Sequence, residues 1–148
     1  MYPKHDEDFY GWVIASTKLM KEGKLSELDI DSLIEEMELM GGSVRQEFLN
    51  RLSVLIAHLL KWRYQPSRRP DDISGRSWRG TIREQRSSLK DLLVDNPSLK
   101  SKDEETLARA YNRAFSIIEK ETPIDLKVLP KECPYTLKQC LDESFYPE

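Results

Sequence analysis

Apolar residues recur every three or four positions along most of the chain, which is the spacing of an amphipathic α-helix. Prolines fall between these stretches: none lies within residues 5–65, 71–96 or 98–122. Because a proline inside a helix costs about 3 kcal/mol, these proline-free windows are where helices can run. No segment alternates apolar and polar residues for long enough to make a convincing strand. The pattern therefore predicts an all-α fold.

The apolar periodicity predicts five helices, at about residues 6–22, 29–40, 43–62, 77–94 and 101–121. Gly23 is placed to end the first helix, and Asp29 to cap the second. We expect Gly41 and Gly42 to separate the second helix from the third. The third helix is apolar nearly all round from residue 54 to 60, which is typical of the central helix of a bundle.

Residues 122–148 differ from the rest because they hold four of the eight prolines. We expect this segment to be mostly extended, with one helical turn near residues 135–141. Its apolar residues indicate that it packs on the helices. The sequence thus predicts a single domain over residues 1–148, an α-helical bundle with its core in 6–121 and an extended Pro-rich C-terminal arm in 122–148.

Composition narrows the class of protein. The chain has 148 residues, 39% of them hydrophobic and 33% charged, which fits one globular domain. Its longest apolar stretch, residues 54–60, is far shorter than the roughly 20 residues of a membrane span. The acidic N-terminus does not resemble a signal peptide, so we expect a cytoplasmic protein without membrane contact. Cys133 and Cys140 are too few for a disulfide scaffold and lack the neighbours of a zinc site, so we expect them to be reduced.

Charge is distributed unevenly. Residues 1–48 hold five basic and eleven acidic residues, a net charge of −6, whereas residues 58–90 hold nine basic and three acidic residues, a net charge of +6. Arginine binds phosphate or carboxylate in a bidentate manner and stacks on aromatic rings, so this mixture suits an anionic partner such as single-stranded nucleic acid or an acidic protein. The candidate binding residues are Lys61, Trp62, Arg63, Arg68, Arg69, Arg76, Trp78, Arg79, Arg83 and Arg86.

Two simpler explanations of the basic stretch stay open. Arg79, Arg83 and Arg86 recur at helical spacing, so they could form the solvated face of one helix. Acidic residues of the second predicted helix, Glu35 and Glu36 among them, could instead neutralise the arginines within the fold.

One histidine is a candidate for chemistry. His58 lies in the most apolar part of the third predicted helix, and Glu35 or Glu36 on the neighbouring helix could make it a general base or a metal ligand. The Glu-x-x-His spacing of carboxylate metal sites is absent, so a structural histidine is favoured. No glycine-rich phosphate loop, Ser-His-Asp order or Cys-His pair is present. We therefore expect no cofactor and no metal, and more readily a binding protein than an enzyme.

Short motifs in a fixed order resemble those of a bacterial, largely cyanobacterial family, the domain-of-unknown-function family numbered twenty-nine. The motifs are Asp8-Phe-Tyr-Gly-Trp12, Leu33-Ile-Glu-Glu-Met37, His58-Leu-Leu-Lys-Trp62, Gln65-Pro66, Ser77-Trp-Arg79, Ile82-Arg-Glu-Gln-Arg86, Asn96-Pro-Ser-Leu99 and Cys133-Pro-Tyr135. The resemblance implies an α-helical domain of the bacterial cytoplasm and supplies no activity. Its motif positions include the histidine, the paired glutamates and four of the basic residues already singled out, Lys61, Arg79, Arg83 and Arg86.

Three hypotheses about function follow. The first is a non-enzymatic module that presents the basic stretch to a nucleic acid or an acidic protein. The second is a hydrolase, for example a metal-dependent nuclease, that uses His58 with Glu35 or Glu36. The third is a structural helical dimerisation module. For the chain itself we expect a monomer or a homodimer.

Overall fold

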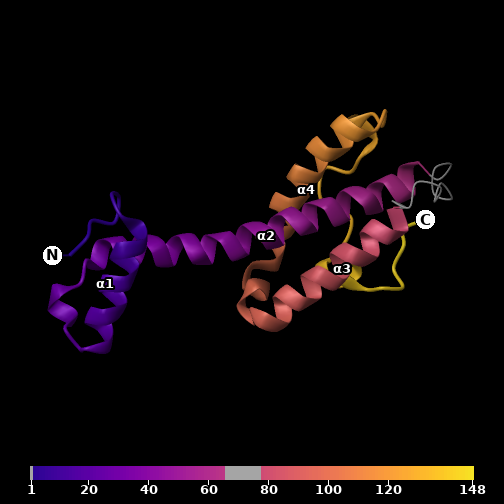
Figure 1. Cartoon of the computed structure of the whole chain (residues 1–148). Helices are drawn as coiled ribbons and strands as arrows, with labels where there is room; N and C mark the ends of the chain where they lie inside the picture. Colours follow the sequence, from indigo (N-terminus) through magenta and orange to yellow (C-terminus); the bar gives the residue numbers. More distant parts are fainter. Residues whose placement is uncertain (1, 66–77) are drawn as a thin grey trace. The chain divides into compact units, whose positions relative to one another are not determined.

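The computed structural model describes residues 2–65 and 78–148, and these residues form helices without any strand (Figure 1). Five α-helices and three short 3-10 helices lie in this part of the chain. The predicted all-α fold is confirmed.

The chain divides into two compact units, Met1–Ser43 and Val44–Glu148. We call them the N-terminal unit and the C-terminal unit and describe each separately. Compactness alone does not make a unit an independently folding domain. The single domain over residues 1–148 therefore stays a prediction.

The N-terminal unit contains α1 (Phe9–Lys21), the 3-10 helix η1 (Leu25–Glu27) and the first part of α2 (Ile30–Tyr64). Helix α1 begins where the Asp8 carboxylate accepts a hydrogen bond from the Gly11 amide at 3.0 Å. It ends before Gly23, whose φ of 72° is a conformation that favours glycine. Asp29 caps α2 as expected, because its carboxylate accepts from the Ser32 amide at 3.2 Å.

The predicted break at Gly41 and Gly42 is wrong. Helix α2 runs without interruption through 35 residues, from Ile30 to Tyr64. A glycine in a helix costs only about 1 kcal/mol relative to alanine, and long flanking runs of good helix formers outweigh two such costs. Neither glycine has a positive φ, and nothing lies within 4 Å of where their Cβ atoms would be.

The C-terminal unit contains the second part of α2, then α3 (Trp78–Asp95), η3 (Pro97–Lys102), α4 (Asp103–Glu121), η4 (Leu126–Val128) and α5 (Leu137–Leu141). Its hydrophobic core is built around α2, which buries eleven residues between Phe48 and Trp62. This agrees with the predicted central position of residues 43–62. Helix α3 adds Ile82 and Leu89 to the core, and α4 adds Tyr111 and Ile118.

Residues 122–148 form part of this core. Leu129, Tyr135, Leu137 and Cys140 from this segment are all buried in it. The predicted helical turn is α5, whose capping box joins Thr136 and Gln139. Helix α5 packs against α3. The C-terminal segment therefore contacts the helix that carries the second part of the basic stretch. None of the described helices is long and apolar enough to cross a membrane.

Candidate anion-binding surface

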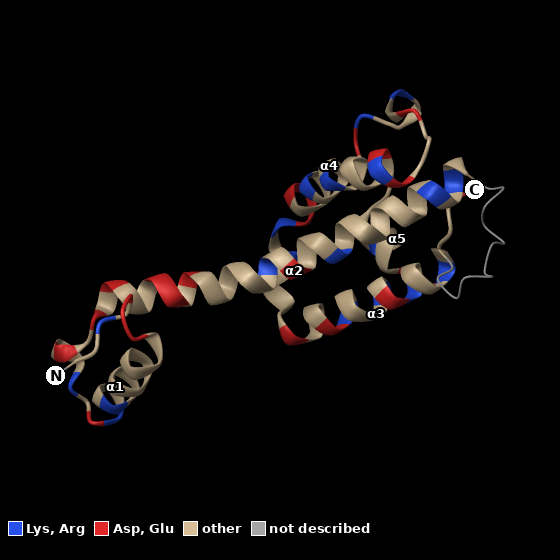
Figure 2. Ribbon diagram, turned by 45° about the horizontal axis from the view of Figure 1, so that its top comes forward, with Lys and Arg blue, Asp and Glu red and all other residues tan. Residues whose placement is uncertain are grey.

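The basic stretch occupies the C-terminal end of α2 and the first half of α3. Figure 2 shows acidic residues along the first part of α2 and basic residues at its end and at the start of α3. Three of the candidate residues, Arg68, Arg69 and Arg76, lie outside the described part of the chain. The remaining candidates fall into a buried group and an exposed group.

Lys61 belongs to the buried group. Its side chain is only 4% exposed, and its Nζ makes an ion pair of 2.9 Å with Glu121 at the end of α4. The apolar stem of a lysine can lie along a core while its ammonium reaches a carboxylate, and this is what Lys61 does. Lys61 therefore joins α2 to α4 and is not available to a partner.

Arg86 is also buried, with 1% of its surface exposed. Its Nε donates to the Cys140 carbonyl at 2.6 Å, and its Nη2 donates to the Phe145 carbonyl at 2.7 Å. Burial lowers the pKa of this guanidinium, which is the direction expected for a desolvated cation. Arg86 therefore ties α3 to the C-terminal segment.

The aromatic residues of the stretch are packed within the same unit. Trp62 is buried, and its ring lies 4.8 Å from the ring of Tyr146 in the C-terminal segment. The guanidinium of Arg79 lies over both rings, 5.2 Å from Trp62 and 5.0 Å from Tyr146. The guanidinium of Arg86 lies 5.2 Å from the same Tyr146 ring. These contacts leave Trp78, which is half-buried, as the most exposed tryptophan of the set.

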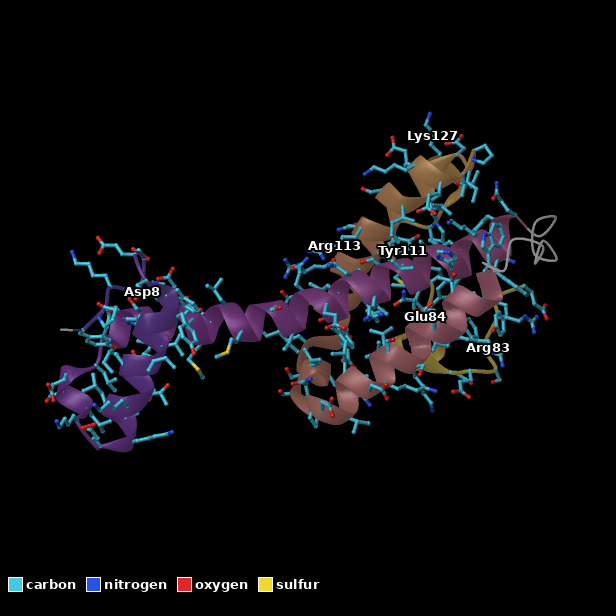
Figure 3. The ribbon with its side chains drawn as sticks, in the orientation of Figure 1. Asp8, Arg83, Glu84, Tyr111, Arg113 and Lys127 are labelled. Carbon is cyan, nitrogen blue, oxygen red and sulfur yellow. The ribbon has the colours of Figure 1, made fainter. Side chains whose placement is uncertain are left out.

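Three arginines form the exposed group. Arg79 and Arg83 lie one turn apart on α3, and Figure 3 shows Arg83 projecting from that helix. Within residues 2–65 and 78–148, neither makes an ion pair with a carboxylate. We call Arg79 and Arg83 the arginine surface. Arg63 is exposed too, but its guanidinium lies over the Tyr64 ring at 5.6 Å, at the end of α2.

A small cavity lies beside the arginine surface. It has a volume of about 290 Å³ and is lined by Arg83, Arg86 and Glu143. One exposed arginine, Arg83, and one buried arginine, Arg86, therefore line the same cavity. Glu143 makes an ion pair with Lys90 at 3.2 Å.

His58 has the partner of a structural histidine. Its Nδ1 is 2.8 Å from the carbonyl of Val54, one turn earlier on α2. Burial, and secondly the nearby charge of Lys61, lower the pKa of the imidazole. This environment favours the neutral ring and supports the structural interpretation.

The glutamates proposed to face His58 lie in the N-terminal unit. The Glu36 carboxylate is 2.6 Å from Nε2 of His5, and Glu35 is exposed. The proposed pairing needed a turn at Gly41 and Gly42 to bring two helices together, and α2 is helical there. No group of three His, Cys, Asp or Glu side chains in the described residues is placed to hold a metal ion.

Sequence reasoning missed two features of this region. His5 was given no role, although hydrogen bonds to Glu36 and Asp6 raise the pKa of its imidazole. The C-terminal segment was expected to pack on the bundle but not to complete the arginine surface with Tyr146 and Glu143. The aromatic pair Phe145-Tyr146, close to the end of a polar tail, was the available signal.

Comparison with known proteins identifies a family for the chain but no activity. The family model described as "Domain of unknown function DUF29" matches residues 4–146, which is nearly the whole chain. No curated protein and no solved structure matches the chain.

Proposed function

Since the chain belongs to the DUF29 family, whose description assigns no function, we propose a function from its own residues: it is an interaction module that binds an anionic partner through Arg79 and Arg83. One observation carries the proposal. Two arginines of α3 are exposed one turn apart, and no carboxylate in the described part of the chain neutralises them. The buried Lys61 and Arg86 contribute to the fold of the unit rather than to its surface.

The packing around Arg79 supports this function. Its guanidinium lies over the rings of Trp62 and Tyr146, so part of its conformational freedom is already lost in the unbound protein. A preorganised arginine loses less entropy when it binds a carboxylate or a phosphate. Arg79 is therefore better placed than a mobile surface lysine to bind an anion.

An acidic protein segment suits this surface better than a nucleic acid does. Stacking of unpaired bases needs exposed aromatic faces. Here Trp62 is buried, Trp78 is half-buried, and Tyr146 is covered by two guanidinium groups.

The test is binding of a glutamate-rich peptide to the full chain, measured by fluorescence anisotropy at low and moderate salt. We expect the double variant Arg79→Gln/Arg83→Gln to bind about ten-fold more weakly, because it removes two charge-assisted contacts. Arg109→Gln is the matched control, since Arg109 is an exposed arginine on α4. Equal binding by the double variant, or an equal loss in the control, would contradict the proposed surface. Tighter binding to single-stranded RNA than to the peptide would overturn the class of partner.

A second candidate function, homodimerisation, rests on a different observation. Of the twelve large apolar residues that are exposed in the described part of the chain, ten lie in the N-terminal unit. Ile30, Ile34 and Met37 recur at helical spacing on α2 and are each at least 50% exposed. An uncovered apolar stripe of this kind is typical of a helix that associates with another.

Sedimentation equilibrium tests the dimer. If the stripe is the interface, the wild-type chain is dimeric at micromolar concentration, and Ile34→Ser/Met37→Ser shifts it to the monomer. Val94→Ser is the matched control, because Val94 is an exposed apolar residue of α3. A wild-type chain that stays monomeric at every concentration would leave homodimerisation without support.

The proposal also keeps the expected cytoplasmic location. Cys133 and Cys140 are free thiols, and burial raises the pKa of both, to about 12 for Cys140. Buried thiols with a raised pKa are poor nucleophiles and resist oxidation, which is compatible with a reducing compartment.

A further inference from the structure

The guanidinium of Arg86 has one nitrogen without an acceptor. Nε and Nη2 are bonded to the carbonyls of Cys140 and Phe145, whereas Nη1 is buried and has no hydrogen-bond partner. Leaving a buried charged donor unpaired costs more free energy than leaving a neutral donor unpaired. An unpaired nitrogen on a fully buried arginine therefore indicates a missing acceptor.

No carboxylate of the described residues takes this place. Asp142 and Glu143 are the acidic groups whose charges act on Arg86. The Asp142 carboxylate accepts hydrogen bonds from the amide and hydroxyl of Ser144, at 2.9 and 2.7 Å, and Glu143 makes its ion pair with Lys90. Among the described residues, the buried cation thus has two carbonyls and an aromatic ring around it, and no ion pair with a carboxylate.

The cavity beside Arg86 has the right size and lining for that anion. Its volume of about 290 Å³ exceeds the roughly 30 Å³ that one water occupies in the liquid, so a small ligand with its hydration fits. Arg83 is an exposed second cation on one wall, and Glu143 is a carboxylate on another. Two arginines that converge on one cavity are the usual protein ligands of a phosphate group.

We propose that the cavity lined by Arg83, Arg86 and Glu143 binds a phosphate group. Nη1 of Arg86 has almost no accessible surface in the unbound protein, so a small movement of this side chain accompanies binding. Nη1 and the guanidinium of Arg83 then donate to the phosphate oxygens. The proposal deepens the proposed function and rests on it in one respect, because Arg83 belongs both to the arginine surface and to this cavity.

Glu143 selects among oxyanions. Hydrogen phosphate keeps a proton on one oxygen at neutral pH, and that P–OH can donate to the Glu143 carboxylate. Sulfate and the phosphodiester of a nucleic acid have no such proton, so Glu143 repels them. The two arginines alone would bind all of these anions, and the carboxylate makes the site specific for a protonated phosphate.

The test is a titration of the full chain with inorganic phosphate and, separately, with sodium sulfate at equal ionic strength. The readouts are isothermal calorimetry and the Nε–Hε signals of the arginines in a ¹⁵N-correlated NMR spectrum. We expect saturable binding of phosphate that shifts the signals of Arg83 and Arg86, and sulfate binding at least ten-fold weaker. No saturable shift with phosphate, or equal binding of the two anions, would overturn the proposal.

Two exposed positions provide variants that preserve the fold. Arg83→Gln removes one donor and should weaken phosphate binding about ten-fold. Glu143→Gln removes the negative charge that repels an anion without a proton, and should strongly reduce the preference for phosphate over sulfate. Arg109→Gln is the control and should bind both anions as the wild type does. An unchanged preference in Glu143→Gln would contradict the role of this carboxylate.

Two further titrations are needed. The first distinguishes the possible sources of the phosphate group, and the second distinguishes the phosphate site from the peptide-binding surface. O-phosphoserine is compared with inorganic phosphate at about pH 5.5, below its second pKa of about 6, so that both ligands keep a proton. Binding at least as tight as that of inorganic phosphate indicates a group carried on a protein partner, and weaker binding indicates free phosphate. Arg79→Gln should weaken binding of the glutamate-rich peptide while leaving phosphate binding unchanged. Peptide binding without phosphate binding would overturn only the proposed phosphate site in the cavity. Phosphate binding without peptide binding would overturn only the acidic peptide as partner of the arginine surface.

Discussion

The two histidines of the chain occupy opposite environments. His5 lies between Glu36 and Asp6, and its hydrogen bonds to these carboxylates raise the pKa of its imidazole. Burial lowers the pKa of His58, which bonds to the carbonyl of Val54. The pairing of His5 therefore contributes stability at low pH that is lost as the pH rises through its raised pKa. The burial of neutral His58 contributes stability above about pH 6.5 that decreases as the pH falls below this value.

This difference predicts two separate titrations in the imidazole region of an NMR spectrum. We expect one histidine to titrate above pH 6.5 and the other below it. Glu36→Gln removes the carboxylate that contributes most to the shift of His5, so the upper titration should move down while the lower one stays in place. Two coincident titrations near 6.5, or a lower titration that moves in Glu36→Gln, would contradict these environments.

At the scale of the elements, the continuity of α2 depends on a balance of small terms. Gly41 and Gly42 each weaken the helix by about 1 kcal/mol relative to alanine, and the flanking sequence compensates. Gly23 differs because its φ of 72° is needed where α1 ends. The same residue type thus marks a helix end at one position and lies within a helix at another.

Alanine substitutions distinguish these two roles. Gly41→Ala and Gly42→Ala should each raise the free energy of unfolding by about 0.5–1 kcal/mol, because the added Cβ meets nothing within 4 Å and alanine favours the helix. Gly23→Ala should lower it by about 1 kcal/mol, since a side chain disfavours a positive φ. Urea unfolding followed by circular dichroism measures all three. Destabilisation by Gly41→Ala would indicate a turn at this position.

The helices were predictable from the periodicity of apolar residues. The residues of the candidate anion-binding surface were only partly predictable from the sequence. Helices α3 and α4 begin and end within two residues of their predicted bounds because proline and polar residues flank them. The break at Gly41 was wrong because propensity is a weak term in a long helix. The burial of Lys61 and Arg86 could not be predicted, since helical spacing does not tell which neighbouring segment covers a charged residue. Their partners, Glu121 and the carbonyl of Cys140, are about 60 and 54 residues away in sequence.

At the scale of the whole molecule, the two units differ in how they are held together. The C-terminal unit contains the entire hydrophobic core cluster, from Phe48 to Cys140. In the N-terminal unit Trp12 and Ser16 are the buried residues of α1, and most of the large apolar residues are exposed. The C-terminal unit therefore carries most of the stability, and it also contains the arginine surface and the cavity.

This division predicts that residues 44–148 fold without the N-terminal unit. The isolated segment should unfold cooperatively, and its amide signals should overlay those of the same residues in the full chain. Residues 1–43 alone should be largely unfolded, because so little apolar surface is buried in them. A disordered segment 44–148 would instead support a single cooperative domain over the whole chain.

The most direct test of the anion-binding module is the salt dependence of glutamate-rich peptide binding by the full chain and by Arg79→Gln/Arg83→Gln. Surface ion pairs weaken as salt screens them, so we expect the wild-type affinity to fall steeply between about 50 and 300 mM salt. Over this range the Debye length shrinks from about 14 Å to about 6 Å. The double variant should bind about ten-fold more weakly at low salt and show a clearly shallower dependence. Identical affinities and identical salt dependence in the two proteins would contradict the proposed role of Arg79 and Arg83.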